Sequence, residues 1–292
     1  MALEIDRLLS HVTRRISAAK GAARIIDPIR RKYAAAYGNR GDGWVTITDY
    51  DGDLKMRVDR SAYLGSHIYW YGYHHRWELE YLKRVLQPNM VFLDVGANQG
   101  TFTLFTAKRL SAGRVLAFEP ESNMRALLVE NLSLNGLDNV QCFDFGLGRR
   151  PERRELFTSG DLSLNLGRNE GLFSSFRSDD RNTYVQEILV RPMDSVLSDL
   201  NVDRVDAIKI DVEGGELDVL LGGQKTLGRW KPKLILEISD SAFRDAGYTK
   251  QALRDLLEPL GYRFYRIYRG ATLRTYEFPE GLSQTSFNII CE

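Results

Sequence analysis

The chain has 292 residues, which is enough for one large domain or two small ones. Hydrophobic residues make up 43% of it and charged residues 27%, a balance that excludes wholesale disorder. The net charge of +1 argues against a dedicated nucleic-acid binder. The two cysteines form no CxxC pair, so neither a disulfide framework nor a structural zinc site is indicated. No run of 18 apolar residues and no secretory signal is found, and we expect a cytoplasmic protein.

Residues 1–40 are predicted to form a basic amphipathic helical extension. Nine Lys and Arg against three acids give this segment a net charge of +6 and leave −5 for the remainder. Such a helix could lie on an anionic membrane surface. Its apolar face lacks a Trp or Phe anchor, so we favour docking on its own domain or on a second subunit of a homo-oligomer. The apolar residues at helical spacing are Ile5, Leu8, Leu9, Val12, Ile16 and Ala19.

Residues 41–77 are predicted to hold a hairpin followed by an aromatic segment. The hairpin pairs Trp44–Thr48 with Leu54–Val58 around an Asp51-Gly52 turn. The aromatic segment, 63–77, either folds over the binding pocket as a lid or seals the joint between the N-terminal part and the sheet, and we favour the joint. As a lid it would offer a general base, His74 or His75, and stacking faces for a sugar ring. Those faces would be Tyr69, Trp70, Tyr71, Tyr73 and Trp77.

Residues 78–292 alternate between strands and helices, which is typical of an α/β fold with a largely parallel sheet and helices on both faces. The expected strands are 90–95, 114–118, 140–145, 206–210, 233–238, 263–268 and 286–291. The expected helices are 78–86, 101–110, 123–134, 216–227 and 249–260. Ligands of such sheets bind beyond the carboxyl ends of the strands, so functional residues should directly follow strands.

The first of these strands ends in Asp94 and runs into a loop that contains Gly96, Asn98 and Gly100. Glycines at this point let the backbone turn sharply and approach a ligand closely. Asn98 replaces the middle glycine of the dinucleotide fingerprint, which disfavours a nicotinamide oxidoreductase. Asp94 could bind an ammonium group or fix the N–H groups of the loop.

The next two strands also end in acids. Glu119 stands where a carboxylate could accept both hydroxyls of a ribose, and Asp144 stands where an adenine amino group would lie. Together with the glycine loop, these acids indicate a nucleoside that carries an amino-acid tail.

Four blocks of sequence resemble the FkbM family of S-adenosylmethionine (AdoMet)-dependent methyltransferases. They are FLDVGANQGTFT (92–103), VLAFEPESNMRALLVENLSLN (115–135), VDAIKIDVEGGELDVLLGG (205–223) and KPKLILEIS (231–239). The resemblance implies a Rossmann-like class I methyltransferase fold over residues 78–292, with a seven-stranded sheet whose last strand is antiparallel. It also implies methyl transfer to an oxygen, often on a sugar, a glycolipid or another small molecule.

Transfer to a hydroxyl is helped by a base that removes its proton. The candidates are Asp211, Glu213 and Glu237, which follow or end the fourth and fifth strands. Asp211 could instead be architectural, and Glu213 could simply begin the next helix, as Glu216 is expected to do. Asp211 and Glu213 could share a Mg²⁺, but two acids make a thin site, so no metal ligands are predicted.

The polar stretch 149–187 either supplies a functional wall or is a β-excursion at the sheet edge. As a wall, it would line the acceptor pocket with Gly171, Ser174 and Ser175. We expect an AdoMet-dependent O-methyltransferase with a small-molecule or carbohydrate acceptor. The alternative from another class is a methyltransferase-fold scaffold that binds AdoMet without turnover in glycan assembly.

Overall fold

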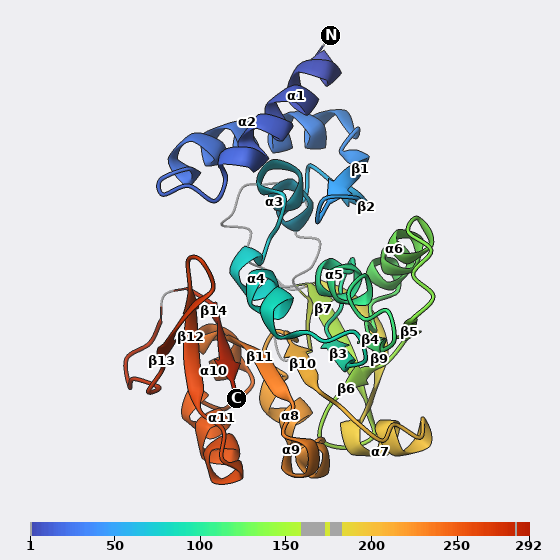
Figure 1. The fold of residues 1–292 in the computed structure, drawn as a ribbon, viewed down its shortest axis with the longest axis vertical. Coiled ribbons are helices and arrows are strands. Elements are labelled where there is room, and N and C mark those ends of the chain that lie inside the picture. Colours follow the sequence, from blue (N-terminus) through green and yellow to red (C-terminus); the bar gives the residue numbers. More distant parts are fainter. Residues whose placement is uncertain (1, 159–172, 176–182, 284) are drawn as a thin grey trace. The chain divides into compact units, whose positions relative to one another are not determined.

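The computed structural model describes residues 2–158, 173–175, 183–283 and 285–292, with side chains from residue 6 onward. These residues divide into two compact units, whose elements are labelled in Figure 1. The first unit holds the described residues of 1–76 together with 133–136, and the second holds the described remainder. Among the residues described, no helix has both the length and the apolar run needed to cross a bilayer.

The second unit is built on a mixed eight-stranded sheet. In spatial order its strands are β13 (Thr272–Thr275), β12 (Phe264–Tyr268), β14 (Phe287–Cys291), β11 (Lys233–Ile238), β10 (Ala207–Ile210), β3 (Val91–Val95), β4 (Arg114–Phe118) and β5 (Val140–Phe143). The strands from β11 to β5 run parallel, and β14 is antiparallel to both of its neighbours. The expected class I methyltransferase sheet, with an antiparallel last strand, is therefore confirmed.

The expected count of seven strands is wrong by one, because β13 adds an antiparallel edge to β12. A turn in which Gly270 and Ala271 have positive φ values of 73° and 50° reverses the chain between these two strands. Strand β13 has only four residues, which are mostly exposed, so it lacks the apolar run by which the other strands are recognised.

Helices α4–α11 flank this sheet, and one of the expected helices is divided. Their bounds are α4 (Arg76–Val85), α5 (Thr101–Ala107), α6 (Ser122–Ser133), α7 (Met193–Asp199), α8 (Glu216–Leu221), α9 (Gln224–Trp230), α10 (Asp240–Asp245) and α11 (Lys250–Leu257), followed by the 3-10 turn Glu258–Leu260. The helix expected over 216–227 breaks at Gly222-Gly223. A β-carbon on Gly222 would lie 2.0 Å from the carbonyl oxygen of Gly148, so only glycine fits at this position.

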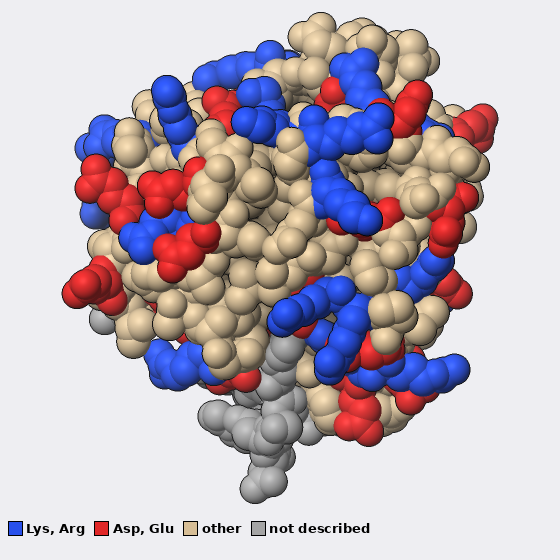
Figure 2. Space-filling view, turned by 90° about the horizontal axis from the view of Figure 1, so that it is seen from below, with Lys and Arg blue, Asp and Glu red and all other residues tan. Residues whose placement is uncertain are grey.

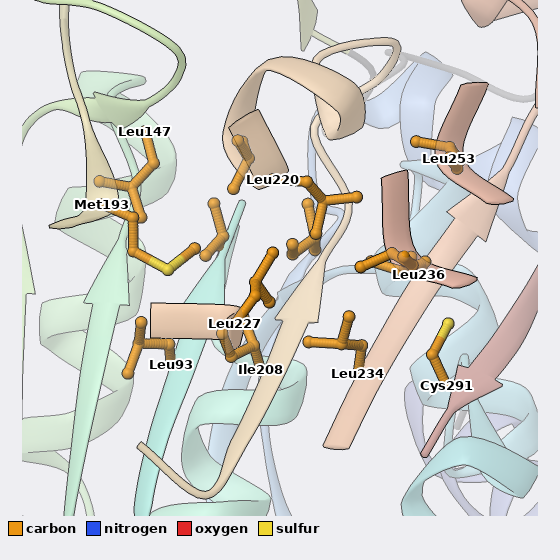
Figure 3. Packing of buried hydrophobic residues seen from close by; sticks show 14 of the residues in the cluster. Leu93, Leu147, Met193, Ile208, Leu220, Leu227, Leu234, Leu236, Leu253 and Cys291 are labelled. Atoms are coloured by element: carbon orange, nitrogen blue, oxygen red, sulfur yellow. The ribbon is translucent and has the colours of Figure 1, made fainter. Parts of the chain in front are cut away.

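Apolar side chains between the sheet and its helices form the core of this unit (Figure 3). Leu93, Ile208 and Leu234 come from three adjacent strands, and Leu220 and Leu227 from α8 and α9 pack against them. Burying one such side chain contributes about 1.5–3 kcal/mol. This packing fixes the carboxyl ends of the strands.

A second, four-stranded sheet occupies the described part of the polar stretch. Its spatial order is β6 (Gly146–Leu147), β9 (Tyr184–Arg191), β7 (Glu152–Thr158) and β8 (Phe173–Ser174). This part of the stretch is therefore a β-excursion. Gly171 lies outside the described residues.

Figure 2 shows both acidic and basic side chains around a broad area of other residues on one face of the molecule, with several Lys and Arg next to one another in the upper part of the view. This distribution agrees with the near-zero net charge of the chain.

The first unit contains α1 (Ala2–Ile16), α2 (Ala23–Arg40), β1 (Trp44–Tyr50), β2 (Leu54–Asp59) and α3 (Tyr63–Tyr71). The antiparallel hairpin of β1 and β2 is confirmed. The predicted helical extension over residues 1–40 consists of two helices rather than one, because the chain turns at Gly21, with a φ of 84°, and continues as α2. Residues 63–71 of the aromatic segment form α3, which contacts α1, α2 and β2.

The polar face of α1 is the face that points inward. Thr13 Oγ1 donates to the carbonyl of Trp70 at 2.8 Å. Arg14 Nε donates to the carbonyl of Tyr69 at 2.8 Å, and Ser17 Oγ to the last carbonyl of α3 at 3.0 Å. The final carbonyls of a helix have no partner within the helix. Side chains of α1 and of the residue that follows it therefore cap α3.

A buried ion pair joins α1 to the end of the hairpin. Arg60 NH1 donates to Asp6 Oδ2 at 2.9 Å, and Tyr37 also donates to this carboxylate. The Arg60 and Asp6 side chains are only 5% and 2% exposed. Each charge is therefore kept in the interior by the other.

We expect Arg60→Met to lower the free energy of unfolding of this unit by about 3–5 kcal/mol, because it leaves Asp6 charged and buried without its cation. Chemical denaturation would measure the change, with the exposed Arg31→Met as control. Adding Asp6→Asn should recover part of the loss. An Arg60→Met protein that unfolds like the wild type would show that the pair has no such role.

Candidate active site

The loop between β3 and α5 is packed tightly against the neighbouring strands. Gly96, Asn98 and Gly100 have φ values of 82°, 49° and 100°. A β-carbon on Gly96 would lie 2.0 Å from the carbonyl oxygen of Asp211, and the Gly96 N–H donates to Phe118 at 3.0 Å. Asn is among the few non-glycine residues that adopt a left-handed conformation readily. Asn98 therefore maintains the turn where the fingerprint has glycine.

The Glu119 carboxylate ties this loop to the end of β4. The Asn98 N–H donates to Oε2 at 2.7 Å, and the Glu121 N–H donates to Oε1 at 2.8 Å. Burial raises the pKa of Glu119 to about 7, although both hydrogen bonds oppose the shift. Each carboxylate oxygen has a second lone pair, so each can accept one further donor.

Asp94, in β3, is 1% exposed and holds the first turn of α5. Thr103 Oγ1 donates to Asp94 Oδ2 at 2.5 Å. Burial raises the pKa of Asp94 to about 6, while the Thr103 hydrogen bond and the Lys209 charge oppose the rise.

A buried lysine that the sequence analysis missed lies beneath the site. Lys209 is 1% exposed, and its Nζ donates to Asp211 Oδ2 at 2.7 Å. Burial alone would lower the pKa of Lys209, but Asp211, Glu237 and Asp94 together raise it, so the ammonium stays charged. The available signal was a lysine inside the apolar strand AIKI, two residues before an aspartate, which places both side chains on one face.

The three predicted catalytic acids come together above this lysine. One carboxylate oxygen from each of Asp211, Glu213 and Glu237 lies within 4.8 Å of the other two, and each residue is partly exposed. They meet because β10 and β11 are parallel neighbours, with Ile210 opposite Leu236. The pKa of Glu237 is raised well above its usual value, first by burial and then by Asp211 and Glu213. We call Asp211, Glu213 and Glu237 the acidic cluster.

Glu216 holds the turn that carries two members of the cluster. Its Oε1 accepts the Val212 N–H at 3.0 Å, and its Oε2 accepts the Gly214 N–H at 3.0 Å and the Tyr248 hydroxyl at 3.2 Å. Burial raises the pKa of Glu216 to about 7. The residue begins α8, as expected, and it also positions the backbone of the site.

The remaining candidates lie at different places. Asp144 is exposed directly after β5. Ser174 is 2% exposed and donates to the carbonyl of Glu213 at 2.8 Å, so β8 reaches the backbone of the acidic cluster. His74 and His75 belong to the first unit, where their rings meet edge to face at 4.2 Å.

The buried carboxyls predict how stability depends on pH. Folding raises the pKa of Asp94 from 3.8 to about 6, and the pKa values of Glu119 and Glu216 from 4.5 to about 7. Between these limits the folded state therefore binds more protons than the unfolded state. The free energy of unfolding should therefore fall as the pH rises through this window, by at most about 1.4 kcal/mol per carboxyl and per pH unit.

We expect the ligand-free protein to melt at a higher temperature near the low end of this window than above it. Scanning calorimetry over the window would measure the slope. Glu216→Gln cannot ionise and should flatten the slope, whereas the exposed Glu280→Gln should leave it unchanged. A melting temperature that rises steadily with pH would contradict the assignment.

Comparison with known proteins identifies the family. Residues 94–264 match the model of the methyltransferase FkbM domain. Among relatives, the AMB antimetabolite synthetase AmbE of Pseudomonas aeruginosa is 31% identical over 61% of this chain and 10% of its own length. Methyltransferase 1 of Beauveria bassiana is 28% identical over 51% of this chain and 64% of its own. The 2-O-methyltransferase NoeI of Sinorhizobium fredii is 25% identical over 59% of this chain and 72% of its own. The chain thus spans less than two thirds of the length of the first two of these relatives. The family model covers more than half of the chain, which therefore belongs to the methyltransferase FkbM domain family.

Proposed function

We propose that this protein is an AdoMet-dependent O-methyltransferase that acts on a hydroxyl of a sugar, a glycolipid or another small molecule. The observation that carries the proposal is the acidic cluster, which lies at the same edge of the sheet as the glycine loop and Glu119. The glycine loop and Glu119 are suited to hold the methyl donor, and the acidic cluster is suited to accept a proton. The name of one relative, a 2-O-methyltransferase, supports oxygen as the methyl acceptor.

The residues at the ends of β3 and β4 fit AdoMet. Glu119 keeps one lone pair on each oxygen for the ribose hydroxyls after accepting its two backbone hydrogen bonds. Gly96 allows the glycine loop to pack directly against the carbonyl of Asp211, which fixes the loop beside the acidic cluster, and the exposed Asp144 is available to an adenine amino group. AdoMet supplies an electrophilic methyl group on a sulfonium, so the protein has to align the acceptor and take its proton.

The acidic cluster supplies the proton acceptor. Glu237 has a raised pKa, and a carboxylate of raised pKa is the stronger base. Lys209 holds Asp211 in place and keeps a positive charge beneath three carboxylates that would otherwise repel one another. In this arrangement, Glu237 or Asp211 takes the hydroxyl proton as methyl transfer begins.

The same three oxygens could instead bind a divalent cation that lowers the pKa of the acceptor hydroxyl. Hard cations prefer carboxylate oxygens, and Glu237 adds the third ligand that Asp211 and Glu213 lack by themselves. Proton removal by a metal-free carboxylate and ionisation of a cation-bound hydroxyl would differ in their response to chelators, so assays with EDTA and with Mg²⁺ distinguish them.

The ribose contact is tested by Glu119→Ala. Losing a charge-assisted hydrogen bond costs about 1.5–3 kcal/mol, so AdoMet should bind roughly 10–150-fold more weakly. Titration calorimetry on the folded variant measures the affinity, with the exposed Asp138→Ala as control. Unchanged AdoMet affinity in folded Glu119→Ala would remove Glu119 from the donor site.

The role of the cluster is tested by Asp211→Asn, which keeps the side-chain volume and removes the charge. We expect AdoMet affinity to change by less than about threefold, while methyl transfer falls by about 10²–10⁴-fold. Transfer of labelled methyl to a panel of sugars and glycolipids, with and without EDTA or Mg²⁺, measures turnover.

If Asp211 is architectural instead, affinity and melting temperature should fall together while turnover at saturating AdoMet survives. A wild-type protein that binds AdoMet but methylates no hydroxyl in the panel would favour a non-catalytic scaffold.

A further inference from the structure

Helix α1 exposes three large aliphatic side chains. Leu8, Val12 and Ile16 follow one another at intervals of four residues and are 69%, 52% and 38% exposed. Side chains at this spacing lie along one line of a helix. We call these three residues the α1 stripe. The apolar side of an amphipathic helix normally faces the core, so a line of exposed aliphatic side chains is unusual.

The stripe faces outward because the opposite face is already engaged. Ser10 and Thr13 are completely or almost completely buried, and Thr13 donates to a carbonyl of α3. Asp6 is buried with Arg60, and Arg14 donates to another carbonyl of α3. Turning α1 to bury the stripe would break these bonds and leave buried polar groups without partners. The outward orientation is therefore fixed by the structure of the first unit.

Two exposed arginines of α1 flank the stripe, and the partly exposed acid Asp49 of β1 is paired with Arg14 and lies 3.3 Å from His11. Arg7 and Arg15 are exposed and lie one residue before Leu8 and Ile16. Between residues 6 and 40, where every side chain is described, each exposed charged side chain is Lys or Arg. The two acids of this range, Asp6 and Asp27, are buried and half-buried. The exposed charge of residues 6–40 is thus positive.

We propose that α1 docks on the surface of an anionic lipid bilayer, with Leu8, Val12 and Ile16 in the interfacial layer and Arg7 and Arg15 at the lipid phosphates. An apolar helical stripe beside basic residues matches both layers of such a surface. Because the stripe has no aromatic anchor, binding depends on the positive charge and should be sensitive to salt.

A second copy of the chain is a poorer occupant. Two-fold pairing through the stripe would bring Arg7 and Arg15 close to the same residues of the partner, which is repulsive. Three aliphatic side chains also cover much less than the roughly 800 Å² that each partner buries in a standard interface.

The test is co-sedimentation of the full chain with vesicles of phosphatidylcholine, with or without phosphatidylglycerol, at low and high salt. We expect binding only to the vesicles that contain phosphatidylglycerol, and loss of that binding at high salt. The triple variant Leu8→Gln, Val12→Gln, Ile16→Gln should bind at least about tenfold more weakly. The double variant Arg7→Gln, Arg15→Gln should bind roughly 30-fold more weakly.

A double variant of two exposed leucines of the second unit, Leu189→Gln and Leu282→Gln, serves as the matched control and should bind like the wild type. All variants change exposed residues and should keep their melting temperatures. Failure of the wild type to bind anionic vesicles, or full binding by the triple variant, would overturn the proposal. A dimer in light scattering without vesicles that the triple variant abolishes would identify a second copy as the occupant.

Discussion

The site depends on one ion pair at the end of β10, between the buried Lys209 and the partly exposed Asp211. Asp94, Asp211 and Glu237 all raise the pKa of the Lys209 ammonium, so this one buried charge is attracted by acids from three neighbouring strands. Without the ammonium, these carboxyls would have to be protonated or exposed to water, because unpaired buried charges are costly. The pair therefore allows several acids to gather at one edge of the sheet.

The backbone around this pair is held as firmly as the side chains. Glu216 accepts two N–H groups from the turn after β10, and Glu119 accepts one from the glycine loop and one from the end of β4. The near-contact between Gly96 and the Asp211 carbonyl joins the two loops directly. The buried carboxyls of Glu119 and Glu216 thus fix the loops, whereas the acidic cluster is partly exposed.

Sequence reasoning predicted the parts of the fold that have one dominant cause. Strands β4 and β11 were placed at their observed bounds because continuous apolar runs between turns have few other outcomes. The acids at the strand ends were found because parallel strands collect their carboxyl ends at one edge. Lys209 was missed because a lysine is usually exposed, and only the tertiary structure supplies the acids that allow it to be buried. Strand β13 was missed because it buries almost nothing.

Helix α1 shows a second limit of sequence reasoning. An amphipathic pattern indicates that a helix has two different faces, but it does not indicate which of them is inside. The apolar face is usually the buried one, because burying a large apolar side chain contributes about 1.5–3 kcal/mol. In this unit the end of α3 presents carbonyls that need donors, at about 1–3 kcal/mol for each one left unsatisfied. Thr13, Arg14 and Ser17 meet that need, and Arg14 adds a charge that the carboxyl end of a helix favours. Several satisfied polar groups thus outweigh the three aliphatic side chains that remain exposed, and the apolar face stays free to bind another surface.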